Sequence, residues 1–281
     1  MTIDELLALV KSHEDRILFC AQARRIDPLT LRCQLLLHLP LPAAIGFDNE
    51  LAIAAAVVEE KQRPYATWLV PPQKPVLLDN LDFGPLHEIT AKPFHERFHH
   101  VGSFRPGQHY AFWDRTTGRL VCMGSVSSFD LDHVREKIGD IAPESVLMFS
   151  RFFAFRWAPK NIFSYFWSKL RGHLIKNYGT NLMFSFINPN LGFDAASHKA
   201  CQWVPFAYEE GTNYMYLDGR YRTMRFVLQN PNTSYEVSTM DLKPLLILAN
   251  PLQRKAQKVI PATPYLFKRP AVPKPVEAGP A

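Results

Sequence analysis

The sequence feature that most constrains the fold is a long apolar segment that passes through a short break into an amphipathic helix. Residues 145–157 are mostly aromatic and aliphatic and predict a strand, and residues 162–178 repeat large apolar side chains at helical spacing. Between them, Pro159 is compatible with the first turn of a helix. The first backbone N–H groups of such a helix lack internal partners and lie at the positive end of its dipole. The segment therefore predicts either an anion site suited to a pyrophosphate or an ordinary strand–helix connection.

Further strand and helix patterns alternate around this segment. The other predicted elements are strands at residues 109–114, 119–129, 181–187 and 205–217 and a short helix within residues 190–203. The turn at residues 115–118 joins the first two strands as a β-hairpin. This order predicts an α/β fold, with a mixed sheet that carries helices on both faces.

The two ends of the chain have a different character. Residues 1–90 predict an N-terminal α+β region of unknown role, with helices at 2–25 and 49–61 and an extended, strand-compatible segment at 29–41. After residue 237 the periodicity fades, and residues 249–281 are rich in proline and carry a basic run. The expected parts are thus an N-terminal region at 1–90, a central domain at 91–237 and an extended basic tail at 238–281.

Composition narrows the setting in which the chain acts. The N-terminus is acidic and lacks the basic start and apolar run of a secretory signal, and the four cysteines form no C-x-x-C pair. No apolar stretch of the sequence is long enough to span a bilayer. We therefore expect a cytoplasmic protein without a membrane partner and with reduced thiols. The net charge of +6 favours a polyanionic partner.

A second motif follows the strand predicted at residues 181–187. Asn188-Pro189-Asn190 precedes Gly192, and the next helix ends near Trp203. Combined with residues 150–161, this arrangement resembles the GNAT superfamily of acyltransferases and, in detail, the Mom-like family of phage DNA-modification proteins. The residues that carry the resemblance are Ser150, Arg151, Ala158, Pro159, Lys160, Asn161, Asn188, Pro189, Asn190, Gly192, Ala200 and Trp203.

The resemblance implies a GNAT-like fold, acetyl-CoA or another acyl-CoA as cofactor, and transfer of the acyl group to nucleic acid, namely to the exocyclic amine of adenine in DNA. It also implies a bacterial cell or a phage-infected host as the setting. The chain departs from the GNAT pattern twice, because its pyrophosphate turn contains no glycine and His198 replaces the usual tyrosine acid. A histidine can donate a proton in that role.

The resemblance also implies the site residues, and no metal ligand is among them. The catalytic candidates are His198, Tyr221 and Ser150. The cofactor candidates are Phe155, Arg156, Trp157, Ala158, Pro159, Lys160, Asn161 and Asn190. The substrate candidates are Arg151, Asn188, His99 and His100. If His198 lies away from the cleft, Tyr214, Tyr216 or Tyr221 is the alternative acid.

DNA is the expected partner, because the run between Arg254 and Lys274 is basic and can contact phosphates. Phe98 and Phe104 are among the aromatic residues expected to stack on a base that has left the duplex. Two other functions stay open at this point. One is a GNAT enzyme that acetylates a small amine, an amino acid or a protein, and the other is a non-catalytic nucleic-acid-binding protein of GNAT shape.

Overall fold

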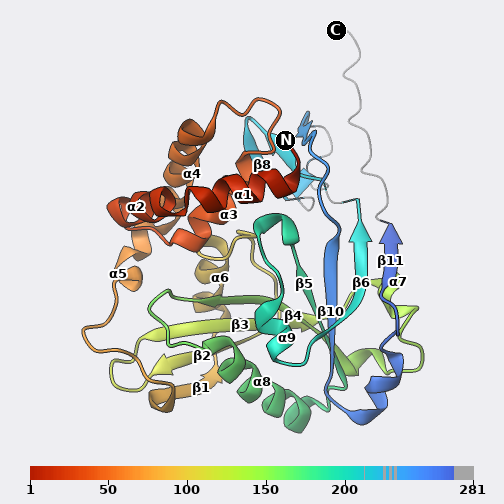
Figure 1. The fold of residues 1–281 in the computed structure, drawn as a ribbon. Coiled ribbons are helices and arrows are strands. Elements are labelled where there is room, and N and C mark those ends of the chain that lie inside the picture. Colours follow the sequence, from red (N-terminus) through yellow and green to blue (C-terminus); the bar gives the residue numbers. More distant parts are fainter. Residues whose placement is uncertain (212, 224–225, 228–229, 231–232, 269–281) are drawn as a thin grey trace.

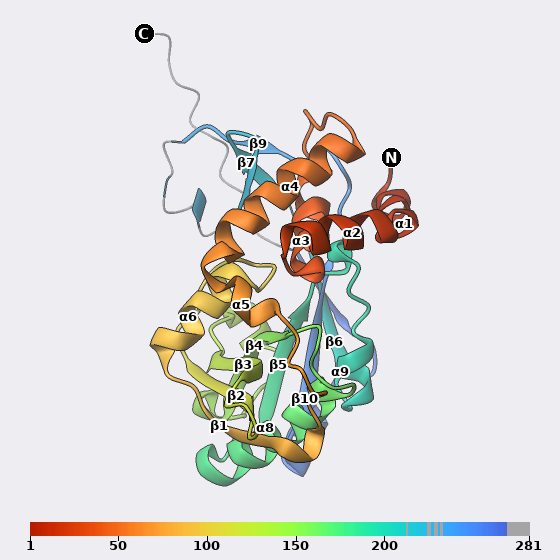
Figure 2. The ribbon, with the colours of Figure 1, turned by 90° about the vertical axis from the view of Figure 1, so that its left-hand side faces the viewer.

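The computed structural model describes residues 1–211, 213–223, 226–227, 230 and 233–268. Figure 1 shows two layers, a large β-sheet with its helices and, above it, the N-terminal helices α1 to α4. Figure 2 shows the same division after a quarter turn, with the helical layer resting on one end of the sheet. Within the described residues, no helix is long and apolar enough to cross a membrane.

The large sheet has eight strands among the described residues, in the order β1-β2-β3-β4-β5-β10-β6-β11. Their bounds are β1 Leu81–Pro85, β2 Gln108–Asp114, β3 Leu120–Ser128, β4 Val146–Ala154, β5 Leu182–Ile187, β6 Val204–Glu210, β10 Leu245–Pro251 and β11 Tyr265–Lys268. Neighbouring strands are antiparallel, except that β4 runs parallel to β5 and β6 runs parallel to β11. The predicted mixed sheet is confirmed, and so is the hairpin of β2 and β3.

A second, small sheet pairs β7 Met215–Leu217 with β8 Arg220–Arg222 and β9 Glu236–Val237. The single strand predicted at residues 205–217 is therefore wrong, because the chain leaves the large sheet after β6 and enters the small one at β7. Tyr216 anchors the small sheet to the helical layer, since its hydroxyl donates to the Leu37 carbonyl at 2.8 Å.

The C-terminal part of the chain is the largest departure from the prediction. The sequence predicts an extended tail over residues 238–281, but β10 lies in the middle of the sheet between β5 and β6. Leu248 faces one core and Ile247 and Ala249 face the other. A strand buried on both faces shows no alternation of apolar and polar residues, so its short apolar run is hard to recognise.

The basic run predicted to contact DNA is divided by this arrangement. Its first part forms the 3-10 helix η5 Arg254–Val259, whose Ala256 is buried against the sheet. Lys268 ends β11, and Arg269 and Lys274 lie outside the described residues. The chain up to residue 268 therefore belongs to the folded body, and the predicted tail is wrong over that part.

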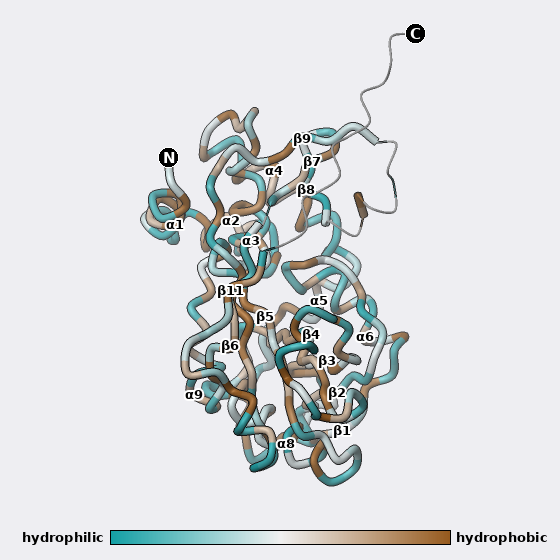
Figure 3. The backbone as a smooth tube through the Cα atoms, turned by 90° about the vertical axis from the view of Figure 1, so that its right-hand side faces the viewer, coloured by the Kyte–Doolittle hydropathy of each residue, from teal (hydrophilic) through white to brown (hydrophobic). Residues whose placement is uncertain are grey.

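Helices cover both faces of the large sheet, as predicted. α8 Ile162–Tyr178 packs so closely on one face that a Cβ atom at Gly124 would lie 2.5 Å from the Phe166 ring. α6 Glu88–Arg97 covers the opposite face, where Phe94 meets Phe153. Figure 3 shows hydrophobic residues concentrated along the strands between them. The remaining short elements are η1 Arg63–Tyr65, α5 Ala66–Leu69, η2 Leu78–Asn80, α7 Asp132–Arg135, η3 Pro143–Ser145, η4 Pro189–Leu191 and α9 Ala196–Ala200.

The N-terminal layer consists of α1 Ile3–Ser12, α2 Glu14–Arg24, α3 Pro28–His38 and α4 Phe47–Gln62. The one helix predicted at residues 2–25 is in fact two helices that meet at His13. The helix predicted at residues 49–61 is confirmed as α4. The strand-compatible segment predicted at residues 29–41 is wrong, because it forms α3.

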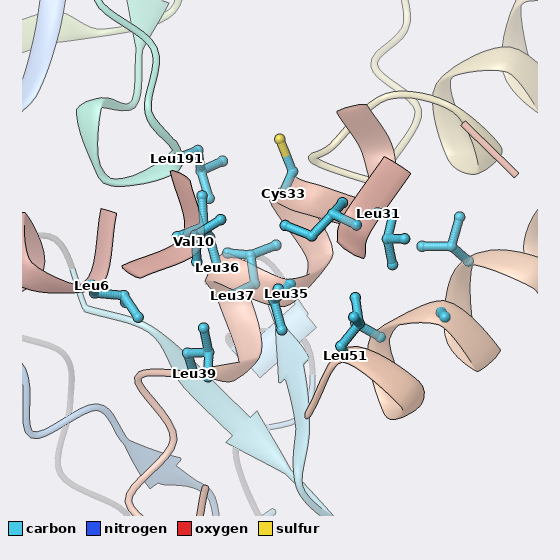
Figure 4. Packing of buried hydrophobic residues seen from close by; sticks show 14 of the residues in the cluster. Leu6, Val10, Leu31, Cys33, Leu35, Leu36, Leu37, Leu39, Leu51 and Leu191 are labelled. Atoms are coloured by element: carbon cyan, nitrogen blue, oxygen red, sulfur yellow. The ribbon is translucent and has the colours of Figure 1, made fainter. Parts of the chain in front are cut away.

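α3 is a helix for reasons that are local. Asp27 caps it by accepting a hydrogen bond from the Thr30 N–H at 2.7 Å, and Pro28 occupies its first turn. Most residues of α3, Leu31 and Leu36 among them, are buried in the core of the helical layer (Figure 4). A helix that is apolar nearly all round has no polar stripe, and so its period is difficult to detect in the sequence.

A buried network of hydrogen bonds fixes this layer to the sheet. The Gln62 side chain accepts from the Asp27 N–H at 2.8 Å and donates to the Arg97 carbonyl at 3.0 Å. The Thr30 hydroxyl donates to the Phe98 carbonyl at 2.8 Å. These bonds join α3 and α4 to the end of α6. Residue 90, where the sequence predicts the end of the N-terminal region, lies inside α6, which packs on the sheet.

Candidate active site

Strands β4 and β5 separate from each other partway along their length. Their parallel pairing ends at Met148 and Phe184, although both strands continue. The cause lies in β4, where the register with β3 shifts between Ser125 and Val126 and leaves Ser150 without a register partner. A bulge of this kind bends the strand that carries it. The sheet is therefore open between two strands at its centre.

A cavity of about 730 Å³ occupies this opening. Its walls include residues 148–154 of β4 and residues 185–188 at the end of β5. Leu29, Thr30 and Leu37 close it from the helical layer. A volume of this size is typical of sites for small molecules and cofactors. The N-terminal helices thus complete the cavity, a role that the sequence did not indicate.

The structure brings the predicted catalytic and substrate residues together around this cavity. The seven that line it are Ser150 and Arg151 from β4, His99 and His100 after α6, Asn188 after β5, His198 in α9 and Tyr221 in β8. These residues are far apart in the sequence, and the opening of the sheet is what places them on one surface.

His198 lies where β4 and β5 diverge. Its Nε2 atom is 3.2 Å from the Ser185 hydroxyl, which is itself 3.3 Å from the Phe149 carbonyl. The rings of Phe163 and Trp203 flank the imidazole. Burial lowers the pKa of His198 to about 4. The imidazole is therefore neutral at pH 7 and carries no imidazolium proton to give away, so this environment does not favour its predicted role as the acid.

Tyr214 is a second group with a proton on the cavity wall. Its hydroxyl accepts a hydrogen bond from the Asn188 side-chain amide at 3.1 Å, and burial raises the pKa of Tyr214. The hydroxyl therefore keeps its proton at neutral pH, and no acceptor among the described residues takes it. The ring of Tyr221 lies beside it, with centroids 5.5 Å apart. Tyr216 does not line the cavity, because its hydroxyl is bonded to the helical layer.

The segment between β4 and α8 has unused backbone donors. The N–H groups of Lys160, Asn161, Phe163 and Ser164 have no hydrogen-bond acceptor within the described ranges. Asn161 adopts a left-handed backbone conformation, with φ of 63°, directly before the helix. Free donors at the start of a helix form the kind of anion site that the sequence predicts. The cavity reaches this helix at Phe163.

The side chains of the same segment are held by the protein. Trp157 donates its indole N–H to the Trp68 carbonyl at 3.2 Å and stacks on Phe155 with ring centroids 5.1 Å apart. Phe155 is buried on the α6 face of the sheet, whereas Arg156 and Lys160 are exposed. The two aromatic residues therefore fix the segment that carries the free N–H groups.

Asn190 has a structural role in place of the predicted cofactor contact. Its side chain is fully buried and does not line the cavity. Its amide group donates to Asn188 Oδ1 and to the Lys243 carbonyl, both at 2.9 Å, and its oxygen accepts from the Lys243 N–H at 2.8 Å. Every polar atom of the side chain is thus engaged within the protein. Asn190 joins the loop after β5 to the segment that leads into β10.

Arg151 lies beside a group of buried histidines. It donates to the Ser150 carbonyl at 2.6 Å. Burial and the charge of Arg151 lower the pKa of His100 to about 3, and burial holds the pKa of His99 well below its ordinary value. Burial and the charge of Arg105 lower the pKa of Arg151 to about 10. This part of the wall therefore carries one buried positive charge beside neutral imidazoles. In the described part of the chain, no group of His, Cys, Asp and Glu is placed to hold a metal ion.

Two residues that line the cavity were not among the main site residues predicted from the sequence. Ser185 lies in the middle of β5, where nothing in its neighbourhood marks it, and Tyr214 appears only as an alternative to His198. The signal for Tyr214 is weak because it precedes a three-residue strand, β7, that belongs to the small sheet.

No family model and no curated protein matches the chain. Among solved structures, the chain is similar to the ribosomal-protein-S5-alanine acetyltransferase from Vibrio fischeri, with 9% identity over 59% of this chain and 69% of that chain and a TM-score of 0.35. It is similar to spermidine/spermine N-acetyltransferase SpeG from Vibrio cholerae, with 7% identity over 64% and 98% of the two chains and a TM-score of 0.41. It is also similar to yncA from Salmonella typhimurium, solved with its cofactor acetyl-CoA, with 8% identity over 66% and 98% and a TM-score of 0.40. At such identities and TM-scores, these likenesses assign no activity and no residue to this chain.

Proposed function

We propose that the protein is an acyl-CoA-dependent acyltransferase whose cofactor lies in the opening between β4 and β5. The observation that carries the proposal is this opening, in which two central parallel strands lose their pairing after Met148 and Phe184 beside a cavity of about 730 Å³. Unpaired strands in the middle of a sheet give up hydrogen bonds of the ladder. A ligand with a chain of amide groups, such as the pantetheine arm of CoA, can replace those bonds.

The residues at the start of α8 fit the other end of such a cofactor. The free N–H groups of Lys160, Asn161, Phe163 and Ser164 suit a pyrophosphate, and the exposed Lys160 side chain adds a positive charge beside them. When bound, acyl-CoA supplies an acyl group activated as a thioester. The chain itself contributes binding groups along β4 and at the first turn of α8.

Tyr214 is the residue that we assign to proton donation. Its hydroxyl is protonated at neutral pH, and the Asn188 amide, which donates to the oxygen at 3.1 Å, stabilises the phenolate that donation leaves and opposes the rise in the pKa of Tyr214 that burial causes. His198 is neutral and pairs with Ser185 at 3.2 Å, so its assigned role is to position that hydroxyl at the point where the strands part. Tyr221 lines the same wall and stays a catalytic candidate.

The acceptor that we propose is the exocyclic amine of adenine in nucleic acid, as the sequence resemblance implies. Phe104 lines the cavity and is half-buried, and a flat base can stack on its ring. Phe98, also predicted to stack, is buried with its ring packed against Phe94 and Phe153 and does not take this role. Arg151 and Asn188 supply polar groups for the edge of the base. The base must be single-stranded or leave the duplex to reach them. The positive net charge of the chain favours an anionic acceptor over a polyamine.

Calorimetric titration of the full-length protein with acetyl-CoA tests the cofactor, and mass analysis of nucleosides from DNA treated with protein and acetyl-CoA tests the acceptor. We expect one acetyl-CoA bound per chain and an acyl-sized mass increase on deoxyadenosine. Ser185→Phe, which places a ring in the opening, should abolish acetyl-CoA binding. Thr117→Phe, at the exposed turn between β2 and β3, is the control and should bind normally.

The outcomes separate the two parts of the proposal. Absence of acetyl-CoA binding to the wild-type protein contradicts the function as a whole. Acetyl-CoA binding with unmodified DNA, together with acetylation of a small amine, leaves acyl transfer in place and replaces the acceptor. Circular dichroism of each variant shows whether the fold persists.

A further inference from the structure

A second cavity lies beside the first. It has a volume of about 220 Å³ and is formed where α3, α4 and α6 end, together with β8. Four of its lining side chains are cationic, namely Lys61, Arg97, Arg220 and Arg222, and one, Glu60, is acidic. The C-terminal ends of three helices contribute roughly −0.5 charge each. The side chains outweigh this contribution, and the cavity is therefore positive.

The four cationic side chains form no close ion pair within the described residues, although the charge of Glu60 acts on Lys61. None of the ion pairs within the described residues includes any of the four. Arg97 donates to the Lys61 carbonyl at 2.8 Å, but its Nε atom and that of Arg222 are buried with no hydrogen-bond partner in the described part of the chain. Buried donors without partners cost free energy, which an anion bound in the cavity would recover.

The charges also act on one another. The pKa of Lys61 is lowered first by burial and then by the positive charge of Arg222, is raised in part by Glu60, and is lowered further by Arg220. The pKa of His38 is lowered to about 4 by burial and by the charges of Lys61 and Arg220, which leaves this imidazole neutral at pH 7. Mutual repulsion of this kind is relieved when an anion binds between the charges.

The two cavities share a boundary. Leu37 and Phe98 line the large cavity, whereas the adjacent residues His38 and Arg97 line the small one. Tyr221 lines both. A molecule whose reactive group lies in the large cavity can thus reach the small cavity with a charged group past Tyr221.

We propose that the small cavity binds a phosphate group of the acceptor molecule whose amine lies in the large cavity. The link to the amine rests on the proposed acyl transfer, whereas phosphate binding itself does not. Guanidinium groups bind phosphate through paired, charge-assisted hydrogen bonds, and Lys61 adds a compact charge. The shared chemistry is a phosphate ester, carried either by a mononucleotide or by the backbone of a nucleic-acid strand.

Calorimetric titration of the full-length protein with inorganic phosphate, AMP and adenosine tests this site. R220Q/R222Q removes two charges from the cavity, and the matched control R16Q/R115Q removes two charges from exposed pairs with Asp48 and Asp82. We expect the affinity for phosphate and for AMP to fall by at least about 10-fold in R220Q/R222Q and to stay unchanged in the control. Adenosine should bind wild type and R220Q/R222Q equally.

A second variant guards against a local packing effect, because Arg222 also lies over the Phe226 ring at 4.9 Å. K61Q changes a different element and should weaken phosphate binding in the same direction. A short single-stranded oligodeoxynucleotide that binds more tightly than AMP, with the same loss in both variants, identifies the backbone as the source of the phosphate. Equal affinities identify a mononucleotide.

Three results would overturn the proposal. These are undetectable binding of phosphate to wild type, unchanged phosphate affinity in both variants, and displacement of phosphate by CoA, since the last assigns the cavity to the cofactor. Phosphate binding without any acyl transfer keeps the phosphate site and contradicts the proposed function instead.

Discussion

The loops that follow the parallel strands β4 and β5 differ in how their polar groups are hydrogen-bonded. The loop after β4 enters α8 with N–H groups, such as those of Lys160 and Ser164, that have no acceptor among the described residues. At the start of the loop after β5 the polar groups bond within the protein, since Asn188 Oδ1 accepts from the Asn190 N–H at 3.0 Å and Asn190 forms two hydrogen bonds with Lys243. The start of α8 therefore has free backbone donors and the Asn188–Asn190 segment does not, although the N–H groups of Ser197 and His198 in the first turn of α9 also have no acceptor among the described residues.

A strand–loop–helix pattern in the sequence therefore locates polar groups at the end of a strand but does not identify their hydrogen-bond partners. Both loops carry proline and asparagine directly after an apolar strand, and they are equally conspicuous in the sequence. Polar groups at the end of a strand can bond to the protein or to a ligand, and the residue type alone does not say which. The partner is decided by β10, which brings Lys243 to the second loop and has no counterpart at the first.

The largest effect among the variants that test this difference between the two loops is expected at Asn190. Asn190→Ala removes three buried hydrogen bonds and leaves both polar groups of the Lys243 backbone without that partner. We expect the free energy of unfolding to fall by about 3 kcal/mol, measured by urea denaturation, with acetyl-CoA affinity unchanged in the folded protein. Asn177→Ala, at an exposed position of α8, is the control and should change stability by less than about 0.5 kcal/mol. Full stability with lost cofactor affinity would return Asn190 to the cofactor site.

The next effect concerns the loop after β4. A glycine inserted between Pro159 and Lys160 displaces the free N–H groups without adding or removing charge. We expect acetyl-CoA affinity to fall by about 100-fold, the loss of roughly two charge-assisted hydrogen bonds, while the melting temperature changes little. The control is a glycine inserted between Thr117 and Gly118, in the exposed turn of the β2–β3 hairpin. Normal acetyl-CoA affinity in the first variant would mean that the loop holds no pyrophosphate.

A smaller effect compares the two residues that precede the helices. Asn161 has φ of 63° and Ala195 has φ of 62°, so each loop contains one left-handed residue that is not glycine. Asparagine tolerates this conformation better than alanine. Asn161→Ala should therefore lower the free energy of unfolding by about 1 kcal/mol, and Ala195→Gly should raise it by up to about 1 kcal/mol. Thermal unfolding of the two variants checks the signs, and equal signs would contradict the backbone geometry.

The smallest effect at neutral pH is expected at His198, which follows the second loop. Its pKa of about 4 lies below the ordinary histidine value of 6.5, so between these values an unfolded histidine binds a proton and the folded one does not. The free energy of unfolding therefore falls as pH decreases through that window, and His198→Gln should reduce this fall. Above about pH 6.5 the variant should keep turnover within about 10-fold and show an unchanged pH profile. A lost acidic limb in the profile would mean that His198 donates a proton after all.

Much of the sheet could be predicted from the sequence, because β2, β3, β4, β5 and α8 each show a clear period and are joined by short connections. The helix α3 and the strand β10 could not be, because each is apolar nearly all round and an apolar run alone does not distinguish a helix from a strand. Their true positions depend on neighbours distant in the chain, namely α4 for α3 and the pair β5 and β6 for β10.

The candidate site likewise contains residues that could be predicted from the sequence and residues that could not. Ser150, Arg151, Asn188 and His198 lie within the recognisable motifs and do line the cavity. The wall formed by α3 could not be predicted, and Tyr214 was predicted only as an alternative to His198, because both depend on how the N-terminal layer and the small sheet pack on the open end of the large one. The environment that lowers the pKa of His198 is likewise a product of packing.

The most direct test of the central claim is amide hydrogen exchange of the full-length protein with and without saturating acetyl-CoA, read residue by residue. We expect exchange to slow at Lys160, Asn161, Phe163 and Ser164, whose N–H groups have no acceptor among the described residues. Exchange should stay unchanged at Asn190, whose N–H already donates to Asn188 Oδ1. Unchanged exchange at the start of α8, or protection confined to the loop after β5, would contradict the claim.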